Sequence, residues 1–318
     1  MQSRPSPRSS GCWPLPRPPF GLPDSKAASL PRGGRRCRSA PFPARKSALP
    51  SPLLGNDGEV NYVALAMSEF ASWLSYQQFA ASVAREWRFT RSAGQKAFID
   101  AVLATAGSRH DSIPLGAILW RAQEGHGWYE EQEGVDVPVP LLTERMKPER
   151  DRAKEGRANP KGLPYLYTAS HRETAISEVR PWIGAYVSVS EFTVVRPLTI
   201  VNCTSQASGS PLFYLKEPEP SEREAANWKA IDRAFSRPVT PNDHLADYVP
   251  TQILAEAFRH HGLDGIGYRS ALGPGHNIVL FDLGAAVVSQ RILCRVQSLK
   301  LDTENQEPVP RPETITSP

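Results

Sequence analysis

Residues 156–180, GRANPKGLPYLYTASHRETAISEVR, give the strongest indication of the fold in this sequence. Its first part, residues 156–162, predicts a cationic loop, because two glycines and a proline cannot continue a helix or a central strand. Residues 163–169 are largely aromatic and aliphatic and predict a short strand bounded by that loop. Ser170 is followed three residues later by Glu173, the spacing of a capping box, so a helix is expected to begin there and to stop before the next proline.

Glu178 is the residue of that helix whose role is open. Loop, strand and helix together would bring it into one neighbourhood with Arg157 and Tyr167. It stands near the expected C-terminus of the helix, where the macrodipole disfavours a carboxylate. One interpretation is a solvated carboxylate on the helix face, or one partner of an ion pair with Arg180, and the other is a functional carboxylate. Composition alone does not decide between them.

The same stretch resembles the RES domain, a family named for an arginine, a glutamate and a serine that recur in that order. The family has a loop of the form GRxNPxG, a strand that ends in a Tyr-x-Ala-Ser-like turn, and a helix with Ala-x-x-Glu. In this sequence the three motifs fall at residues 156–162, 167–170 and 175–178. The three signature residues match Arg121, Glu178 and Ser270. The resemblance spans roughly residues 115–283.

The fold class that this resemblance implies is α+β, like that of ADP-ribosyltransferases. It predicts mixed, mostly antiparallel sheets with flanking helices, preceded by a short helical segment, with two small sheets forming a cleft for NAD+. The sequence itself shows short strands interrupted by helices. It has no G-x-G-x-x-G between a strand and a helix, so a Rossmann domain is disfavoured.

The resemblance also implies a catalytic set and a cofactor-binding set for NAD+. The expected catalytic residues are Arg121, Glu178 and Ser270, and the expected cofactor-binding residues are Arg157, Asn159 and Tyr167. The guanidinium forks of Arg121 and Arg157 suit a diphosphate, which they can hold bidentately. Glu178 would stabilise the oxocarbenium character that develops on the ribose when the nicotinamide–ribose bond breaks.

Each of the other site residues has a second interpretation. Ser270 would orient Glu178 or hydrogen-bond the nicotinamide ribose, but taken alone it is a turn residue. Tyr167 offers a ring for stacking or a hydroxyl for a phosphate contact. Asn159 has the alternative of pinning its own loop through an Asx turn, and Arg121 that of a surface ion pair.

The activity implied is cleavage of the nicotinamide–ribose bond of NAD+, by phosphorolysis or hydrolysis, in the manner of a growth-inhibiting toxin. Many RES domains are the toxin of a bacterial toxin–antitoxin pair, so a helix-turn-helix antitoxin is an expected partner besides NAD+. No metal and no cofactor beyond NAD+ as substrate are expected. Two alternatives stay open: ADP-ribosylation of a protein target, and a non-catalytic binding module built on the RES fold.

Composition divides the chain into four parts. The expected boundaries are 1–66 for a Pro/Arg-rich tail, 67–110 for a helical extension, 113–300 for the RES domain with an insertion at 124–155, and 301–318 for a second tail. Both tails are expected to be disordered, because they lack the apolar pattern that forms a core. The first tail has the charge of an organellar transit peptide, or it is upstream sequence with Met67 as the true start, and we favour the second interpretation.

Charge is unevenly placed along the 318 residues, whose formal net charge is +4. Residues 1–55 contain ten lysines and arginines against Asp24, a charge of +9, so the remainder carries −5. No direct nucleic-acid partner is therefore expected. No run of about 18 or more uncharged apolar residues occurs, so no membrane-spanning helix is expected either. The four cysteines are Cys12, Cys37, Cys203 and Cys294; they lack metal-site spacing, which suits the reducing cytoplasm.

Apolar periodicity predicts the remaining elements. Helices are expected within residues 68–106, at 221–234, where Ser221 and Glu224 repeat the capping-box spacing, and at 247–261. Strands are expected at 113–122, 185–195, 198–201, 265–268, 277–281 and 285–296. The insertion at 124–155 is charged and Gly-rich without a clear period, and we expect it to cover one face of the domain.

Overall fold

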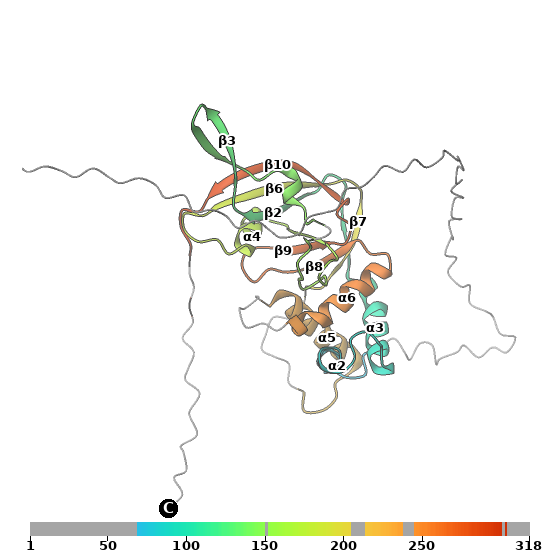
Figure 1. Ribbon diagram of the computed structural model, residues 1–318. Coiled ribbons are helices and arrows are strands. Elements are labelled where there is room, and N and C mark those ends of the chain that lie inside the picture. Colours follow the sequence, from blue (N-terminus) through green and yellow to red (C-terminus); the bar gives the residue numbers. More distant parts are fainter. Residues whose placement is uncertain (1–68, 150–151, 205–213, 238–244, 301–302, 304–318) are drawn as a thin grey trace, which may run out of the picture. The chain divides into compact units, whose positions relative to one another are not determined.

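The computed structural model describes residues 69–149, 152–204, 214–237, 245–300 and 303 (Figure 1). All of these residues belong to the unit Gly58–Pro318. The predicted tail at 1–66 and the start at Met67 lie outside the described residues, and so does the tail at 301–318 apart from residue 303.

The described strands form one eight-stranded sheet and one separate pair. Along the large sheet the order is β1-β7-β8-β9-β5-β2-β6-β10. Its strands are β1 (His110–Ile113), β2 (Ile118–Glu124), β5 (Leu166–Ala169), β6 (Tyr186–Val194), β7 (Leu198–Asn202), β8 (Gly265–Arg269), β9 (His276–Leu280) and β10 (Ala286–Arg295). Neighbours run antiparallel except β7 and β8. The α+β prediction of a mixed, mostly antiparallel sheet is confirmed.

The large sheet has a weak seam between β2 and β5. These two strands are joined by a single pair, Trp120 with Ala169. By contrast, β2 pairs with β6 over seven residues and β5 with β9 over four. The two small sheets expected from the resemblance are therefore a five-strand part and a three-strand part of one sheet, which diverge on either side of the seam.

Five α-helices and three short 3-10 helices flank the described strands. The α-helices are α2 (Ser75–Arg85), α3 (Ala93–Ala106), α4 (Arg172–Glu178), α5 (Pro220–Ser236) and α6 (Val249–His260). The 3-10 helices are η1 (Gly107–Arg109), η2 (Thr143–Met146) and η4 (Leu245–Tyr248). Helices α2 and α3 confirm the predicted N-terminal helical segment. A reciprocal capping box between Ser92 and Gln95 starts α3.

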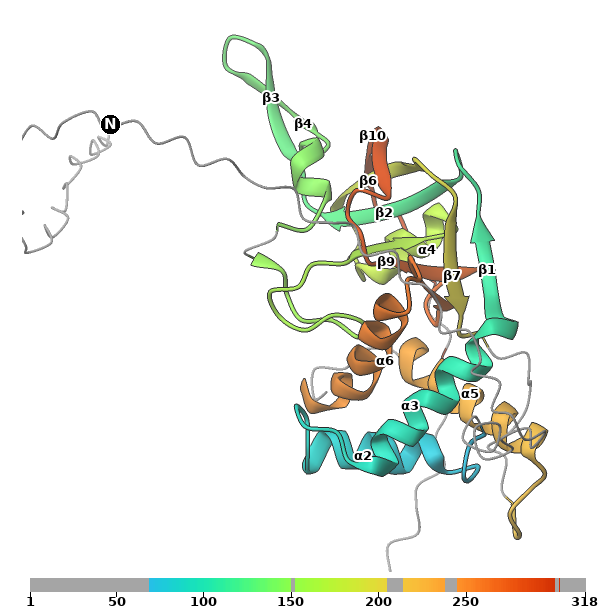
Figure 2. The same ribbon diagram turned by 90° about the vertical axis from the view of Figure 1, so that its right-hand side faces the viewer.

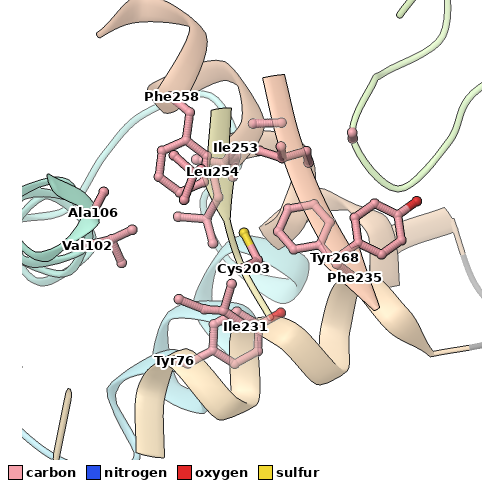
Figure 3. Packing of buried hydrophobic residues seen from close by; sticks show 14 of the residues in the cluster. Tyr76, Val102, Ala106, Cys203, Ile231, Phe235, Ile253, Leu254, Phe258 and Tyr268 are labelled. Carbon is pink, nitrogen blue, oxygen red and sulfur yellow. The ribbon is translucent and has the colours of Figure 1, made fainter. Parts of the chain in front are cut away.

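The largest hydrophobic cluster lies where α2, α3, α5 and α6 meet strand β8 (Figures 1 and 2). Figure 3 shows its packing, in which Phe235 of α5 stacks on Tyr268 of β8. Leu254 and Phe258 of α6 are fully buried in the same cluster. Burial of one such side chain contributes roughly 1.5–3 kcal/mol. The helices thus hold β8, and with it the residue that follows the strand, Ser270.

The strand expected at 113–122 is wrong in its bounds. The chain turns between β1 and β2 at Pro114 and Gly116, and Gly116 has a φ of 81°, a conformation that favours glycine. Apolar residues lie on both sides of the turn, so the sequence pattern predicts one strand where the structure has two.

The irregular insertion expected at 124–155 contains a regular hairpin. Strands β3 (Gly127–Gln132) and β4 (Val135–Val139) pair with each other and not with the large sheet. No residue of either strand is fully buried. Residues 127–132 show no apolar alternation, whereas Val135, Val137 and Val139 do alternate, a short strand signal that the prediction of an irregular insertion did not use.

The two predicted capping boxes are also wrong. Helix α4 has His171 as its N-cap and no side-chain cap, because the Ser170 hydroxyl accepts from the His276 backbone N–H at 3.0 Å. Helix α5 has Glu219 as its N-cap and Pro220 at its first position. Proline needs no N–H partner there, so the start of α5 is formed without a serine cap.

Candidate active site

The carboxylate of Glu178 lies at the end of α4 and is held by the neighbouring sheet. Its Oε1 accepts from Ser270 Oγ at 2.8 Å and from Asn277 Nδ2 at 2.7 Å. Ser270 follows β8 and Asn277 lies on β9, with exposed fractions of 7% and 8%. Glu178 itself is exposed, and its Oε2 has no hydrogen-bond partner among the described residues. One oxygen is therefore fixed by the protein and the other remains available.

Arg121 lies on β2 next to the seam of the sheet. Its Nη1 donates to the Tyr167 carbonyl of β5 at 2.9 Å, where β2 and β5 no longer pair. Its Nε is buried and has no partner among the described residues. Burial lowers the pKa of the Arg121 guanidinium from its ordinary value, against a smaller opposing effect of Tyr167. Beyond the bond to Tyr167, this buried guanidinium keeps N–H donors for a ligand, among them Nε.

A cavity of about 330 Å³, which we call the Glu178 cavity, opens at the seam. Its lining includes Arg121, Tyr167 and Glu178 together with Asn277 of β9. Apolar side chains of Trp120, Ala122, Ala169, Ala175 and Val179 form much of the rest. Three of the six predicted site residues thus line one cavity, and Ser270 touches the carboxylate at its rim. The size suits part of a dinucleotide.

The loop at residues 156–162, which we call the signature loop, uses its polar groups internally. Buried Asn159 donates through Nδ2 to the carbonyls of Lys154 and Pro160, at 2.9 and 3.1 Å. Its Oδ1 accepts from the Tyr167 hydroxyl at 2.7 Å, and that hydroxyl accepts from the Ala158 N–H at 3.0 Å. Tyr167 therefore presents its ring, not its hydroxyl, to the cavity.

Gly156 is needed where the signature loop crosses Tyr167. A Cβ at this position would lie 2.5 Å from the Tyr167 hydroxyl oxygen and 2.9 Å from Asn159 Oδ1. Both contacts are too close for any side chain. The first glycine of the motif therefore has a packing role.

Arg157 is directed away from the Glu178 cavity. Its Nη1 donates to the Ala234 carbonyl in α5 at 3.1 Å, and its guanidinium lies over the Tyr248 ring at 5.1 Å from the centroid. Its own carbonyl accepts from Thr251 of α6 at 2.6 Å. Arg157 lines neither the Glu178 cavity nor the larger cavity beside it. These groups of Arg157 contact α5, α6 and Tyr248, and its expected meeting with Tyr167 and Glu178 stays a prediction.

Gln123, Tyr268 and Asn277 are among the lining residues that sequence reasoning missed. Asn277 was placed in a strand but not recognised as a partner of Glu178. The available signal was a lone amide at the start of a buried apolar strand, where a polar group requires a partner. Gln123 gave no signal, because its relation to the cavity depends on the divergence of β2 from β5.

Two further features of the described residues concern metal binding and membrane-spanning helices. Among the residues that the structure describes, no group of three or more histidine, cysteine, aspartate and glutamate side chains is placed to hold a metal ion. None of the described helices has the length and apolar character needed to cross a membrane.

Fold and site together define an α+β protein with a cavity at the seam of a mixed sheet and an oriented carboxylate at its edge. The family model of the RES domain matches residues 118–303, more than half of the chain. The chain therefore belongs to the RES-domain family. No curated protein matches the sequence.

One similar solved structure is the crystal structure of the M. tuberculosis MbcT-MbcA toxin-antitoxin complex. The two sequences are 15% identical, and the TM-score is 0.36. The alignment covers 61% of this chain and 92% of that chain.

Proposed function

We propose that this RES-domain protein cleaves the nicotinamide–ribose bond of NAD+, as a toxin-type enzyme of the phosphorylase or glycohydrolase kind. The observation that carries the proposal is the Glu178 carboxylate. It is oriented by two hydrogen bonds from Ser270 and Asn277 while its second oxygen stays available at the edge of a cavity. A carboxylate on a solvated helix face needs no such support.

The proposed chemistry is a glycosyl transfer. The bond between ribose C1′ and the nicotinamide nitrogen breaks, and its electron pair neutralises the pyridinium, so nicotinamide leaves uncharged. An oxygen lone pair of phosphate or water forms the new bond to C1′, and water then gives up one proton to solvent. Positive charge develops on the ribose between these events, and a fixed carboxylate stabilises that charge more than it stabilises the ground state.

The proposed roles follow the geometry. Glu178 faces the ribose, Ser270 and Asn277 hold its Oε1, and Arg121 donates from Nε to a phosphate oxygen. Tyr167 supplies an aromatic wall. Asn159, proposed from the motif as a binding residue, acts by supporting Tyr167.

An antitoxin of the helix-turn-helix class is part of the proposal, because toxin-type RES domains work in such pairs. Its docking on the cavity would exclude NAD+. The cytoplasm, where NAD+ is abundant and thiols stay reduced, is the proposed location.

The test is direct identification of products. Purified full-length protein is incubated with NAD+ with and without inorganic phosphate, and the products are identified by mass spectrometry. We expect free nicotinamide together with ADP-ribose or its 1″-phosphate. In parallel, radiolabelled NAD+ shows whether ADP-ribose stays on protein, the outcome that would favour a protein-modifying transferase. Intact NAD+ after long incubation would leave only the binding-module alternative.

A further inference from the structure

A second cavity of about 590 Å³ lies beside the Glu178 cavity, and we call it the cationic cavity. The two share three lining residues: Arg121, Gln123 and Tyr167. The far side of the cationic cavity comes from described residues in the second half of the insertion at 124–155, namely 145, 147–149 and 152–155. The two cavities therefore adjoin at these three side chains, which we call the shared wall.

Positive charge predominates in the cationic cavity. Its lining includes five cationic side chains, Arg121, Arg145, Lys147, Arg152 and Lys154, against the carboxylates Glu149 and Glu155. Both carboxylates already have partners. Glu149 pairs with Arg145 at 3.0 Å and with Arg152 at 3.6 Å, and Glu155 accepts from Gln252 at 3.1 Å. Lys147 is engaged elsewhere, because its Nζ donates to the carbonyls of Leu283 and Ala286 at 2.7 and 2.8 Å. The other cationic side chains still outnumber the two carboxylates, which favours an anion.

The shared wall has two buried polar atoms without a partner among the described residues, Arg121 Nε and Gln123 Oε1. One is a donor and the other an acceptor. Buried polar atoms in native proteins are nearly always satisfied, so this pair indicates a ligand that accepts at one point and donates at the next. A ribose hydroxyl beside a phosphate oxygen has that pattern.

We infer that the cationic cavity binds the phosphate groups of the dinucleotide, while the nicotinamide ribose lies in the Glu178 cavity. The inference rests on the proposed function and adds to it the residues of this chain that hold the phosphates. Arg121 contacts them at the wall, and Arg145, Arg152 and Lys154 of the insertion surround them. Gln123 accepts a hydrogen bond from a hydroxyl of the nicotinamide ribose, the sugar whose 5′-oxygen is esterified to the phosphates.

The test uses ADP-ribose, which carries both phosphates and lacks nicotinamide, so that no turnover is needed. The full-length protein is titrated with ADP-ribose by calorimetry and compared with the double variant Arg152→Gln/Lys154→Gln. Both side chains are exposed, and loss of their charge leaves the Arg145–Glu149 pair in place. The matched control is Arg85→Gln/Arg88→Gln, which removes two exposed charges that line neither cavity.

We expect the double variant to bind ADP-ribose at least about tenfold more weakly, whereas the control binds as the wild type does. Thermal unfolding of both variants should be unchanged. Equal affinity in the double variant and the control overturns the inference, and so does a wild type that does not bind ADP-ribose. Binding of inorganic phosphate that weakens in the double variant, with unchanged ADP-ribose affinity, assigns the cavity to free phosphate and also overturns it.

Failure of this inference and failure of the proposed function are separable. NAD+ consumption by the wild type tests the function. If the wild type consumes NAD+ while the double variant and the control bind ADP-ribose alike, only the phosphate assignment is wrong.

Discussion

The signature loop and the rim of the Glu178 cavity both carry family motifs, yet they use their polar groups in opposite ways. In the signature loop, Asn159 makes three hydrogen bonds within its own surroundings, and the Tyr167 hydroxyl makes two. At the rim, Arg121 Nε and Gln123 Oε1 are buried without a partner among the described residues, and Glu178 keeps one free oxygen.

The difference distinguishes polar groups that stabilise the fold from polar groups that can contact a ligand. A buried polar group whose partners all come from the protein stabilises the fold, because its removal leaves those partners unsatisfied. A polar group fixed on one side and open on the other is prepared for a ligand. Changes in the signature loop should therefore act on stability, and changes at the rim should act on turnover.

The largest expected effect is that of Glu178→Gln. Glutamine is nearly isosteric and keeps its helix propensity, so the fold should be retained. The negative charge facing the developing oxocarbenium ion is lost, and turnover should fall by roughly 100- to 1000-fold, with NAD+ binding much less affected.

NAD+ consumption and calorimetric NAD+ binding are measured on the variant and the wild type. Glu173→Gln is a matched control, since Glu173 lies in the first turn of the same helix and does not line the cavity. A Glu178→Gln protein with wild-type turnover would show that the carboxylate is only part of the helix face.

Asn159→Ala should lower stability and leave turnover nearly unchanged, the opposite of what Glu178→Gln should do. It removes three hydrogen bonds from a residue that is 2% exposed, and leaves the Tyr167 hydroxyl and two carbonyls without their partner. The free energy of unfolding should fall by about 2–3 kcal/mol. Turnover per folded molecule should stay within a few-fold of wild type.

Chemical denaturation measures that loss, with Tyr167→Phe as a milder control because it removes only the hydroxyl. A stable Asn159→Ala protein that no longer binds NAD+ would show that Asn159 contacts the ligand, as the motif predicts.

Much of the fold could be predicted from the sequence, for reasons visible in particular elements. Helix α6 was predicted because its buried residues, among them Ile253, Leu254 and Phe258, repeat with helical spacing. The β3–β4 hairpin was not, because residues 127–132 have no apolar period and the alternation of Val135, Val137 and Val139 is short and lies in a charged segment.

For the site, sequence reasoning predicted only residues that lie in the family motifs. Glu178, Ser270 and Arg121 were singled out from their local contexts, and the structure brings the first two into hydrogen-bond contact. The places of Asn277 and Gln123 in the site depend on strand pairing between distant segments, and the local sequence gives no signal of that pairing. The direction of Arg157 toward α5 depends likewise on how the helices pack, a tertiary contact with no local signal.

Arg157→Lys tests which of two roles Arg157 has, because the motif predicts a phosphate contact and the geometry shows contacts with α5 and the Tyr248 ring. Lysine keeps the charge but loses the planar group that contacts the Ala234 carbonyl and the Tyr248 ring. We expect the free energy of unfolding to fall by about 1.5–2 kcal/mol, the loss of a hydrogen bond from a charged donor. NAD+ affinity should change less than threefold.

Both quantities are measured on the same preparation, by denaturation and by calorimetry. Unchanged stability together with a tenfold loss of NAD+ affinity would mean that Arg157 reaches the phosphates after all.

Ser270→Ala tests whether Ser270 acts through Glu178. The variant loses the 2.8 Å bond to Oε1, while Asn277 keeps its own. Turnover should fall about three- to tenfold, corresponding to about 1 kcal/mol. In the Glu178→Gln background the same change should have little further effect, and a double-mutant cycle measures this coupling. Fully additive effects would show that Ser270 acts independently of the carboxylate.

The smallest expected effect lies just beyond α4. Arg180 has a φ of 48°, and no other non-glycine residue among those described has a positive φ. It follows the helix at a position where glycine is usual, and its N–H donates to the Ser177 carbonyl at 3.0 Å.

Arg180→Gly removes the steric cost of the left-handed conformation and should raise the free energy of unfolding by about 0.5–1 kcal/mol. Arg180→Ala, which keeps a Cβ and loses the charge, should not. Thermal unfolding and NAD+ turnover are compared for both. If Arg180→Gly is more stable but slower while Arg180→Ala turns over normally, the strained backbone beside Glu178 serves the position of the carboxylate and is retained for function.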